Sequence, residues 1–194
     1  MCAGSALKAP QRPRPETPAE APVIVVVMGV SGCGKSTVGA ALAAALDVPF
    51  VEGDALHPPR NVALMAAGTP LGDTDRLGWL QAVAAVLGSA MTAPPPGRGV
   101  VVSCSALKRS YRDLLRAAAP GLQCLHLSGD PSLLVRRLHA RSGHYMPASL
   151  LQSQLDDLQP PTSEEAALQI DIALPPAAVV AQALHWLRPA SAGL

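Results

Sequence analysis

VIVVVM, residues 23–28, runs directly into GVSGCGKS, residues 29–36, and an amphipathic helical pattern follows at once. The second string matches G-x-x-x-x-G-K-[ST], in which a glycine-rich loop turns its backbone N–H groups inward to hold phosphate oxygens. A buried strand leading in and a helix leading out form the context that this motif requires. The stretch therefore predicts a phosphate-binding loop (P-loop) for a nucleoside triphosphate. The alternative is a glycine-rich turn that binds nothing.

The residues of this loop have separable expected roles. Lys35 reaches the β- and γ-phosphates, and the Ser36 hydroxyl is a ligand of Mg²⁺. The N-terminus of the following helix adds partial positive charge at the same point. The predicted nucleotide site consists of Gly29, Val30, Ser31, Gly32, Cys33, Gly34, Lys35 and Ser36.

Outside this stretch, short apolar runs alternate with helical patterns. Continuous apolar runs fit strands that are buried on both faces, as in a parallel sheet. Strands that alternate with helices predict an α/β fold. We expect a three-layer P-loop NTPase fold, with a five-stranded parallel sheet flanked by helices. The expected strands are Val23–Met28, Val48–Val51, Val100–Ser103, Gln123–Leu127 and Gln169–Leu174.

Length and composition limit the class of protein. The 194 residues suit one domain, placed at 23–194, and the proline-rich residues 1–22 are predicted to be a disordered tail. A net charge of +1 without a basic stripe argues against nucleic-acid binding. No apolar run approaches the ~20 residues that span a bilayer. We expect a cytoplasmic protein that binds neither nucleic acid nor membrane.

The acidic residues narrow the class of nucleotide-binding protein. The run that ends at Ser103 leads into Cys104 and Ser105, where an ATPase motor usually carries an acid, and no guanine-reading N-K-x-D string occurs. Instead, Glu52 and Asp54 follow the second run. A carboxylate there faces the phosphate loop across the top of the sheet. Asp54 is predicted to accept a substrate hydroxyl proton or to hold hydrated magnesium, and the alternative is a helix N-cap.

Four longer segments carry a family resemblance. Residues 52–61, 68–80, 104–116 and 137–145 resemble the GDxLHPxxN, G-x-PL-x-D-x-DR-x-x-WL, CSALKxxYRDxLR and RLxxRxGHF segments of gluconokinases. The resemblance implies a kinase that makes 6-phosphogluconate from gluconate and ATP with Mg²⁺. It also implies a fold like that of shikimate kinase, a helical substrate-binding region, a closing lid and a possible homodimer.

The substrate site expected from this resemblance agrees with the chemistry of gluconate. A polyol with one carboxylate requires cations, of which Arg binds a carboxylate bidentately, and several hydrogen-bonding groups. Lys108, Tyr111 and Arg112 fall within one helical turn, so we expect them to converge on one pocket. The predicted substrate-binding residues are Asp54, His57, Arg60, Asn61, Asp75, Lys108, Tyr111 and Arg112.

The lid segment and Glu52 complete the predicted site. Arg137 and Arg141 lie four residues apart on one helical face, and in the family they belong to the lid over the phosphates. We predict that both are catalytic with Lys35 and Asp54, because cations there stabilise the transferring phosphoryl group. Glu52 stands where many gluconokinases carry Asp, and it is expected to hold Mg²⁺ through a water molecule.

Two alternative functions remain. The first is a P-loop kinase for another small anion, such as shikimate or a nucleoside monophosphate, against which the string LHPPRN at residues 56–61 argues. The second is a non-catalytic nucleotide-binding homologue. That protein would be expected to lack Lys35, Asp54 or the lid arginines, and all of them are present.

Overall fold

A single parallel sheet organises the part of the chain that the computed structural model describes, which is residues 21–93, 99–140 and 148–187. The strand order is β2-β3-β1-β4-β5, and every pair of neighbours is parallel. This sheet confirms the predicted α/β class and number of strands. The strands are β1 (Val23–Met28), β2 (Phe50–Glu52), β3 (Gly99–Ser103), β4 (Gln123–Ser128) and β5 (Ala167–Asp171).

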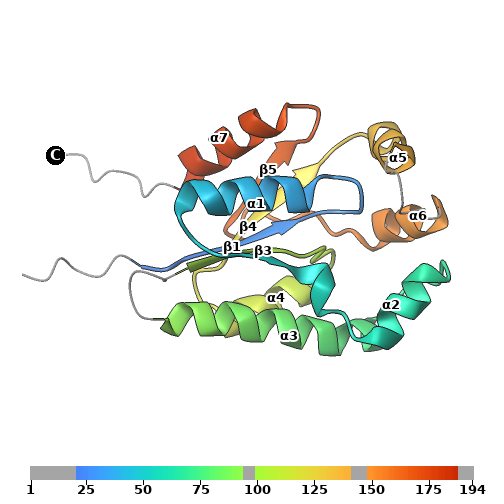
Figure 1. The fold of residues 1–194 in the computed structure, drawn as a ribbon, viewed down its shortest axis with the longest axis horizontal. Coiled ribbons are helices and arrows are strands. Elements are labelled where there is room, and N and C mark those ends of the chain that lie inside the picture. Colours follow the sequence, from blue (N-terminus) through green and yellow to red (C-terminus); the bar gives the residue numbers. More distant parts are fainter. Residues whose placement is uncertain (1–20, 94–98, 141–147, 188–194) are drawn as a thin grey trace, which may run out of the picture.

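Helices cover both faces of the sheet and one of its ends (Figure 1). One face carries α1 (Lys35–Leu46) and α7 (Pro176–Leu187), and the other carries α3 (Asp73–Thr92) and α4 (Arg109–Ala118). Three further helices gather at the end where the P-loop leaves β1, namely α2 (Pro59–Ala66), α5 (Pro131–His139) and α6 (Ala148–Asp157). A short 3₁₀ helix, η1 (Gly53–Leu56), follows β2.

The central strand β1 explains why its sequence is apolar without alternation. Val25 and Val27 pack into the cluster under α1 and α7, whereas Val26 and Met28 pack into the cluster over α3 and α4. All four side chains are fully buried. Since both faces of this strand are covered, every residue gains from being apolar.

Several strand boundaries differ from the expected ones, and hydrogen bonds explain two of these differences. β5 ends at Asp171, because the Asp171 carboxylate accepts a hydrogen bond from Ala173 N at 2.8 Å and turns the chain out of the sheet. β2 begins at Phe50, because Val48 donates its N–H to Ala43 O at 3.1 Å and closes the end of α1 instead. An apolar run alone does not distinguish such capping positions from a strand.

Parts of the sequence prediction fall outside the described residues. These parts are residues 1–20 of the expected tail, Arg141 and the lid segment through Tyr145. Within the described ranges, no helix is long and apolar enough to cross a membrane.

Candidate active site

The P-loop takes a conformation that its glycines make possible. Gly32 and Gly34 have φ angles of 83° and 97°, a region that residues with a Cβ rarely adopt. Gly34 is also the N-cap of α1. Because it has no side chain to accept hydrogen bonds from the first turn, the N–H groups there remain available to a ligand. The loop and helix N-terminus together form the anion cradle that the motif predicts.

Two apolar side chains anchor this loop in the core. Val30 and Cys33 are 3% and 1% exposed and belong to the cluster under α1. Burial raises the pKa of the Cys33 thiol, which keeps it protonated. Lys35 donates from Nζ to Val30 O at 3.2 Å, so its ammonium group is folded against the loop. These contacts fix the loop, and its backbone faces the adjoining cavity.

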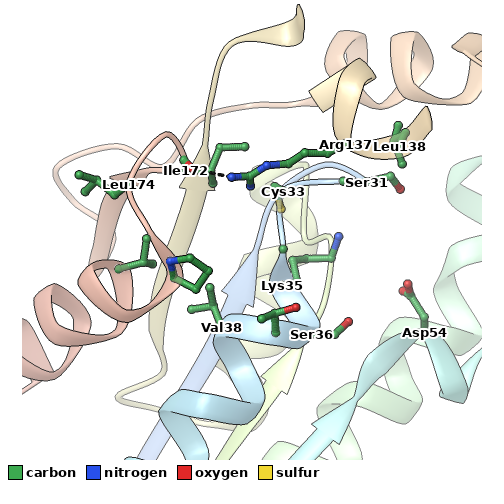
Figure 2. Close-up of a pocket in the computed structure, with 15 residues that line it drawn as sticks. Ser31, Cys33, Lys35, Ser36, Val38, Asp54, Arg137, Leu138, Ile172 and Leu174 are labelled. Carbon is green, nitrogen blue, oxygen red and sulfur yellow. Dashed lines mark hydrogen bonds between the residues drawn. The ribbon is translucent and has the colours of Figure 1, made fainter. Parts of the chain in front are cut away.

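That adjoining cavity has a volume of about 400 Å³ and two chemically different ends. The polar end holds Lys35, Ser36 and Asp54, which lie on one side of the loop in Figure 2. The opposite end is an apolar wall, which we did not predict from the sequence. The apolar residues that continue past the end of β5 were the sequence feature that could have indicated this wall. The wall consists of Ile172, Leu174, Pro176 and Val179.

Arg137 bridges these two ends of the cavity. The side chain projects from α5, and Nη2 donates to Ile172 O at 2.8 Å (Figure 2). The guanidinium group is thereby fixed beside the P-loop and next to the apolar wall. Its partner in the prediction, Arg141, lies outside the described residues.

A second, smaller cavity of about 60 Å³ adjoins the first. Ser31, Lys35 and Asp54 line both cavities, so the two spaces meet at these three residues. Of the residues predicted to bind substrate, Asp54 and His57 line this second cavity. The remainder of its wall comes from Met65, Pro70, Leu71, Arg76, Trp79, Ser105, Leu150, Ser153 and Gln154.

Asp54 owes its position to tight contacts around Gly53. A Cβ on Gly53 would lie 2.0 Å from Ser103 O, so only glycine allows the ends of β2 and β3 to approach this closely. Gly53 N donates to Ser103 Oγ at 3.1 Å, and Trp79 Nε1 donates to Gly53 O at 2.7 Å. The Ser103 hydroxyl also donates to the Glu52 carboxylate. Asp54 lies within η1, whose N-cap residue is Glu52, so Asp54 does not take its expected alternative role as the N-cap of this helix.

His57 is held as a neutral ring by its neighbours. It stacks on Trp79 with ring centroids 4.3 Å apart. Asn61 Nδ2 donates to Asp75 O at 2.8 Å and lies 3.4 Å from His57 Nδ1, which favours the tautomer that carries its proton on Nε2. Burial lowers the pKa of His57; Asp54 raises it and Arg76 lowers it further. Asn61, which is 2% exposed, therefore supports His57 and does not line the cavity itself.

Arg76 is the cation that the sequence reasoning missed. It is 6% exposed, and it lines the second cavity next to His57. Nε donates to Leu71 O at 3.1 Å, and Nη2 lies 3.6 Å from the Asp157 carboxylate. The sequence offered only a weak signal, an arginine in the first turn of α3, and its burial shows that the charge requires a partner or a ligand.

Several predicted substrate residues form ion pairs beside the cavity instead of lining it. Lys108 Nζ donates to Asp73 Oδ1 at 2.6 Å, and the Tyr111 hydroxyl donates to the same carboxylate. The hydrogen bond that Lys108 donates to Asp73 raises the pKa of Lys108. Arg60 Nη1 lies 2.6 Å from Asp75 Oδ1, and Asp75 caps α3 by accepting from Gly72 N.

The structure places Arg112 away from both cavities, contrary to the expected convergence with Lys108. Its side chain is 1% exposed and binds Glu165 through Nε and Nη2 at 2.6 and 2.8 Å. Nη1 donates to Ala106 O and Leu107 O, in the loop where Ala106 has a φ of 44°. We therefore assign Arg112 to holding the loop that carries Ser105.

Two cavities that meet at a P-loop lysine and an aspartate define a P-loop kinase for a small acceptor. A family model described as AAA domain matches residues 24–161. The gluconokinase of Gluconobacter oxydans is 47% identical over 149 residues, covering 77% of this chain and 82% of that protein. The thermoresistant gluconokinase of Escherichia coli is 42% identical and covers 85% of this chain and 93% of that one.

A solved structure agrees with these relatives. The crystal structure of a gluconokinase from Sinorhizobium meliloti is 51% identical, with a TM-score of 0.76 over 86% of this chain and 92% of that chain. The chain therefore belongs to the gluconokinase family of P-loop kinases. This confirms the family resemblance carried by the four sequence segments.

Proposed function

We propose that the protein transfers the γ-phosphoryl group of ATP to the terminal hydroxyl of D-gluconate and forms 6-phospho-D-gluconate and ADP. The observation that carries this proposal is that Ser31, Lys35 and Asp54 border both cavities. A group that passes from a nucleotide in one cavity to an acceptor in the other must cross this junction. Gluconate is the substrate in the names of the relatives.

Asp54 is suited to receive the acceptor's proton. Its exposed carboxylate lies at the junction, on the 3₁₀ turn that Trp79 and Ser103 hold in place. The hydroxyl oxygen forms a bond to the γ-phosphorus, the bond from that phosphorus to the bridging oxygen breaks, and the proton goes to Asp54. Lys35 stabilises the charge on the transferred group.

The residues around the junction also suit Mg²⁺, which neutralises phosphate charge when it is bound. Magnesium in kinases usually takes one or two protein ligands and fills its remaining positions with phosphate oxygens and water. The Ser36 hydroxyl would supply the direct ligand, and Glu52, oriented by Ser103, would act through water. The described residues contain no cluster of three acidic, His or Cys ligands, which agrees with a site completed by the nucleotide.

We assign the base of ATP to the apolar end of the first cavity. Arg137 offers a flat guanidinium face there, and Ile172 and Leu174 offer aliphatic surface. A planar, apolar ring fits between such surfaces. Arg137 would thereby contact the nucleotide, and its predicted catalytic role beside Arg141 remains a prediction.

We assign the carboxylate of gluconate to Arg76. Arg76 is the cation of the second cavity that lies away from the P-loop, and Nη1 makes no hydrogen bond to the other described residues. His57 Nε2 is placed to donate to a hydroxyl between Arg76 and Asp54. Lys108, Tyr111, Arg60 and Asp75 then act by fixing the helices around this cavity. The cytoplasmic location and the homodimer remain predictions of the sequence.

The test is ATP consumption with Mg²⁺ in the presence of gluconate, shikimate, AMP or no acceptor. We expect turnover with gluconate alone, and Asp54→Asn should cut the rate while ATP binding persists. Asp113→Asn, at an exposed carboxylate on α4, is the matched control. Turnover with another acceptor would support phosphoryl transfer from ATP but contradict gluconate as the substrate. No turnover with any acceptor would favour a nucleotide-binding homologue without activity.

A second experiment tests the assignment of Arg76. Arg76→Lys should raise the KM for gluconate at least tenfold, because a bidentate carboxylate contact is worth a few kcal/mol, while the KM for ATP should stay constant. Arg136→Lys, at an exposed position on α5, should change neither constant. An unchanged gluconate KM in Arg76→Lys would contradict the assignment.

A further inference from the structure

One side chain reaches the P-loop from a distant part of the sequence. Gln154, on α6, accepts a hydrogen bond through Oε1 from Ser31 N at 2.7 Å. Both residues line the second cavity together with Lys35 and Asp54. Gln154 therefore lies at the junction where the proposed transfer takes place.

The hydrogen bond to Ser31 determines which end of the Gln154 amide faces the cavity. A backbone N–H only donates, so the atom that meets it is the carbonyl oxygen Oε1. The amide nitrogen Nε2 then carries two N–H donors on the other side of the same planar group. Among the described residues, Nε2 has no hydrogen-bond partner, although the side chain is half-buried.

We propose that Gln154 is a catalytic residue whose Nε2 donates a hydrogen bond to an oxygen of the phosphoryl group during transfer. This inference rests on the proposed kinase function. Ser31 lines both cavities, so the Gln154 amide that is hydrogen-bonded to Ser31 lies next to the boundary between nucleotide and acceptor. The transferred phosphoryl group is the part of the reactants that occupies this boundary.

A neutral, pre-oriented donor is well suited to this position. Lys35 already supplies positive charge at the junction. Negative charge spreads over the equatorial oxygens of the phosphoryl group during transfer, and a fixed donor that meets it stabilises the transition state more than the ground state. Loss of one such donor in enzymes lowers kcat by about 10²-fold or more.

Two substitutions separate the donor from the tether to Ser31. Gln154→Glu keeps the shape and an oxygen that accepts from Ser31 N, but it removes both N–H donors and adds negative charge. Gln154→Met keeps the length and removes both the acceptor and the donors without adding charge. Gln152→Glu is the matched control, because Gln152 lies on the exposed face of α6 and donates to Asp156 Oδ1 at 2.8 Å.

The measurement is kcat and KM for gluconate and ATP, together with the thermal unfolding midpoint of each variant. We expect kcat to fall about 10²-fold in both Gln154 variants, with both KM values changed less than threefold, and Gln152→Glu should match the unmodified enzyme. Full kcat in Gln154→Glu with loss in Gln154→Met would show that Gln154 only tethers the loop, and this would overturn the proposal.

Two further outcomes would also overturn it. A higher KM for gluconate at unchanged kcat would mean that Gln154 contacts the acceptor and not the transferred group. A lowered unfolding midpoint that accounts for the loss of kcat in both variants would mean a structural role. The unmodified protein is assayed in the same series, so absence of gluconate turnover there defeats the proposed function itself, whereas turnover that is indifferent to Gln154 defeats this inference alone.

Discussion

Replacing Glu165 by Gln is predicted to destabilise the protein through the buried cation that it leaves behind. Glu165 is 4% exposed, and its carboxylate accepts from Arg112 Nε and Nη2, from Arg116 Nη2 at 2.8 Å and from Thr162 N at 3.1 Å. Gln retains the shape but removes the negative charge. Arg112, 1% exposed, would then remain buried without a counter-charge.

Two separate arguments give the same magnitude. The hydrogen bonds from Arg112 lower the pKa of Glu165 from 4.5 to about 2, against the opposing effect of burial. A shift of this size corresponds to about 3 kcal/mol of stability at neutral pH. Removal of one partner from buried ion pairs in other proteins costs roughly 3–5 kcal/mol. For a domain of this size we therefore expect the unfolding midpoint to fall by about 6–12 °C.

The assays are thermal unfolding at pH 7, and urea unfolding at pH 7 and again between pH 5 and pH 2, each followed by tryptophan fluorescence. Because the folded-state pKa of Glu165 is depressed, its contribution is complete above the ordinary value of 4.5 and is lost as pH falls toward 2. This part of the acid destabilisation should be missing in Glu165→Gln. Glu164→Gln is the control, since that side chain is 82% exposed and 3.9 Å from Arg109.

The result that would refute this reasoning is a loss below about 1 kcal/mol at pH 7, the size expected of an exposed pair. Such a result would mean that water solvates Arg112, or that the cationic Arg116 moves away and relieves the repulsion. The stability measurement also has a functional counterpart. Because Arg112 holds the carbonyls of Ala106 and Leu107, Glu165→Gln should lower gluconate turnover at temperatures where the variant remains folded.

Three further changes test the geometry around Asp54 and His57. Trp79→Phe removes the donor to Gly53 O and should cost about 1–3 kcal/mol in urea unfolding, with reduced kcat; wild-type values of both would contradict the role of this bond in holding Asp54. Gly53→Ala places a Cβ 2.0 Å from Ser103 O and should destabilise the fold by about 3 kcal/mol or more; an unchanged melting temperature would show that the β2 end can move freely. Burial lowers the pKa of His57 from 6.5, so the neutral ring persists at pH 6.5 and the KM for gluconate should rise only below that value. His57→Gln should flatten this acid limb, and a rise centred above pH 6.5 would exclude His57 as its source.

The central features of the fold follow from local sequence alone. β1 is buried on both faces, so its six consecutive apolar residues carry an unambiguous signal, and the glycines of the P-loop specify its turns. The apolar run expected as a strand at 169–174 also contains residues of a cavity wall, and the sequence does not distinguish the two. Ile172 and Leu174 line the first cavity, and a strand and a pocket wall require the same residue type.

The acceptor site was harder to predict, because it depends on partners distant in sequence. In the sequence, Lys108 and Arg112 are both cations near the N-terminus of α4. Arg112 is directed into the interior by Glu165, which lies 53 residues away, and Lys108 remains beside Asp73, 35 residues earlier. Arg76 received no role from the sequence, and the packing of α3 against α4 is what buries it. No spacing rule within a single helix contains these long-range contacts.

The distinct walls of the two cavities come from separate stretches of chain, and this has a consequence for protein engineering. The first cavity, which we assign to the nucleotide, takes its apolar wall from residues 172–179, whereas the second cavity, which we assign to the acceptor, takes much of its wall from residues 57–79 and 150–154. Segments 57–79 and 150–154 could therefore be exchanged as a cassette to admit a different acceptor, while the surface proposed for the base of ATP stays intact. Ser31, Lys35 and Asp54 would have to remain fixed in such a graft, because a change at any of them alters both halves of the reaction at once. Trp79 and Gln154 would also have to be kept within the exchanged segments, because Trp79 holds the turn that carries Asp54 and Gln154 is hydrogen-bonded to Ser31.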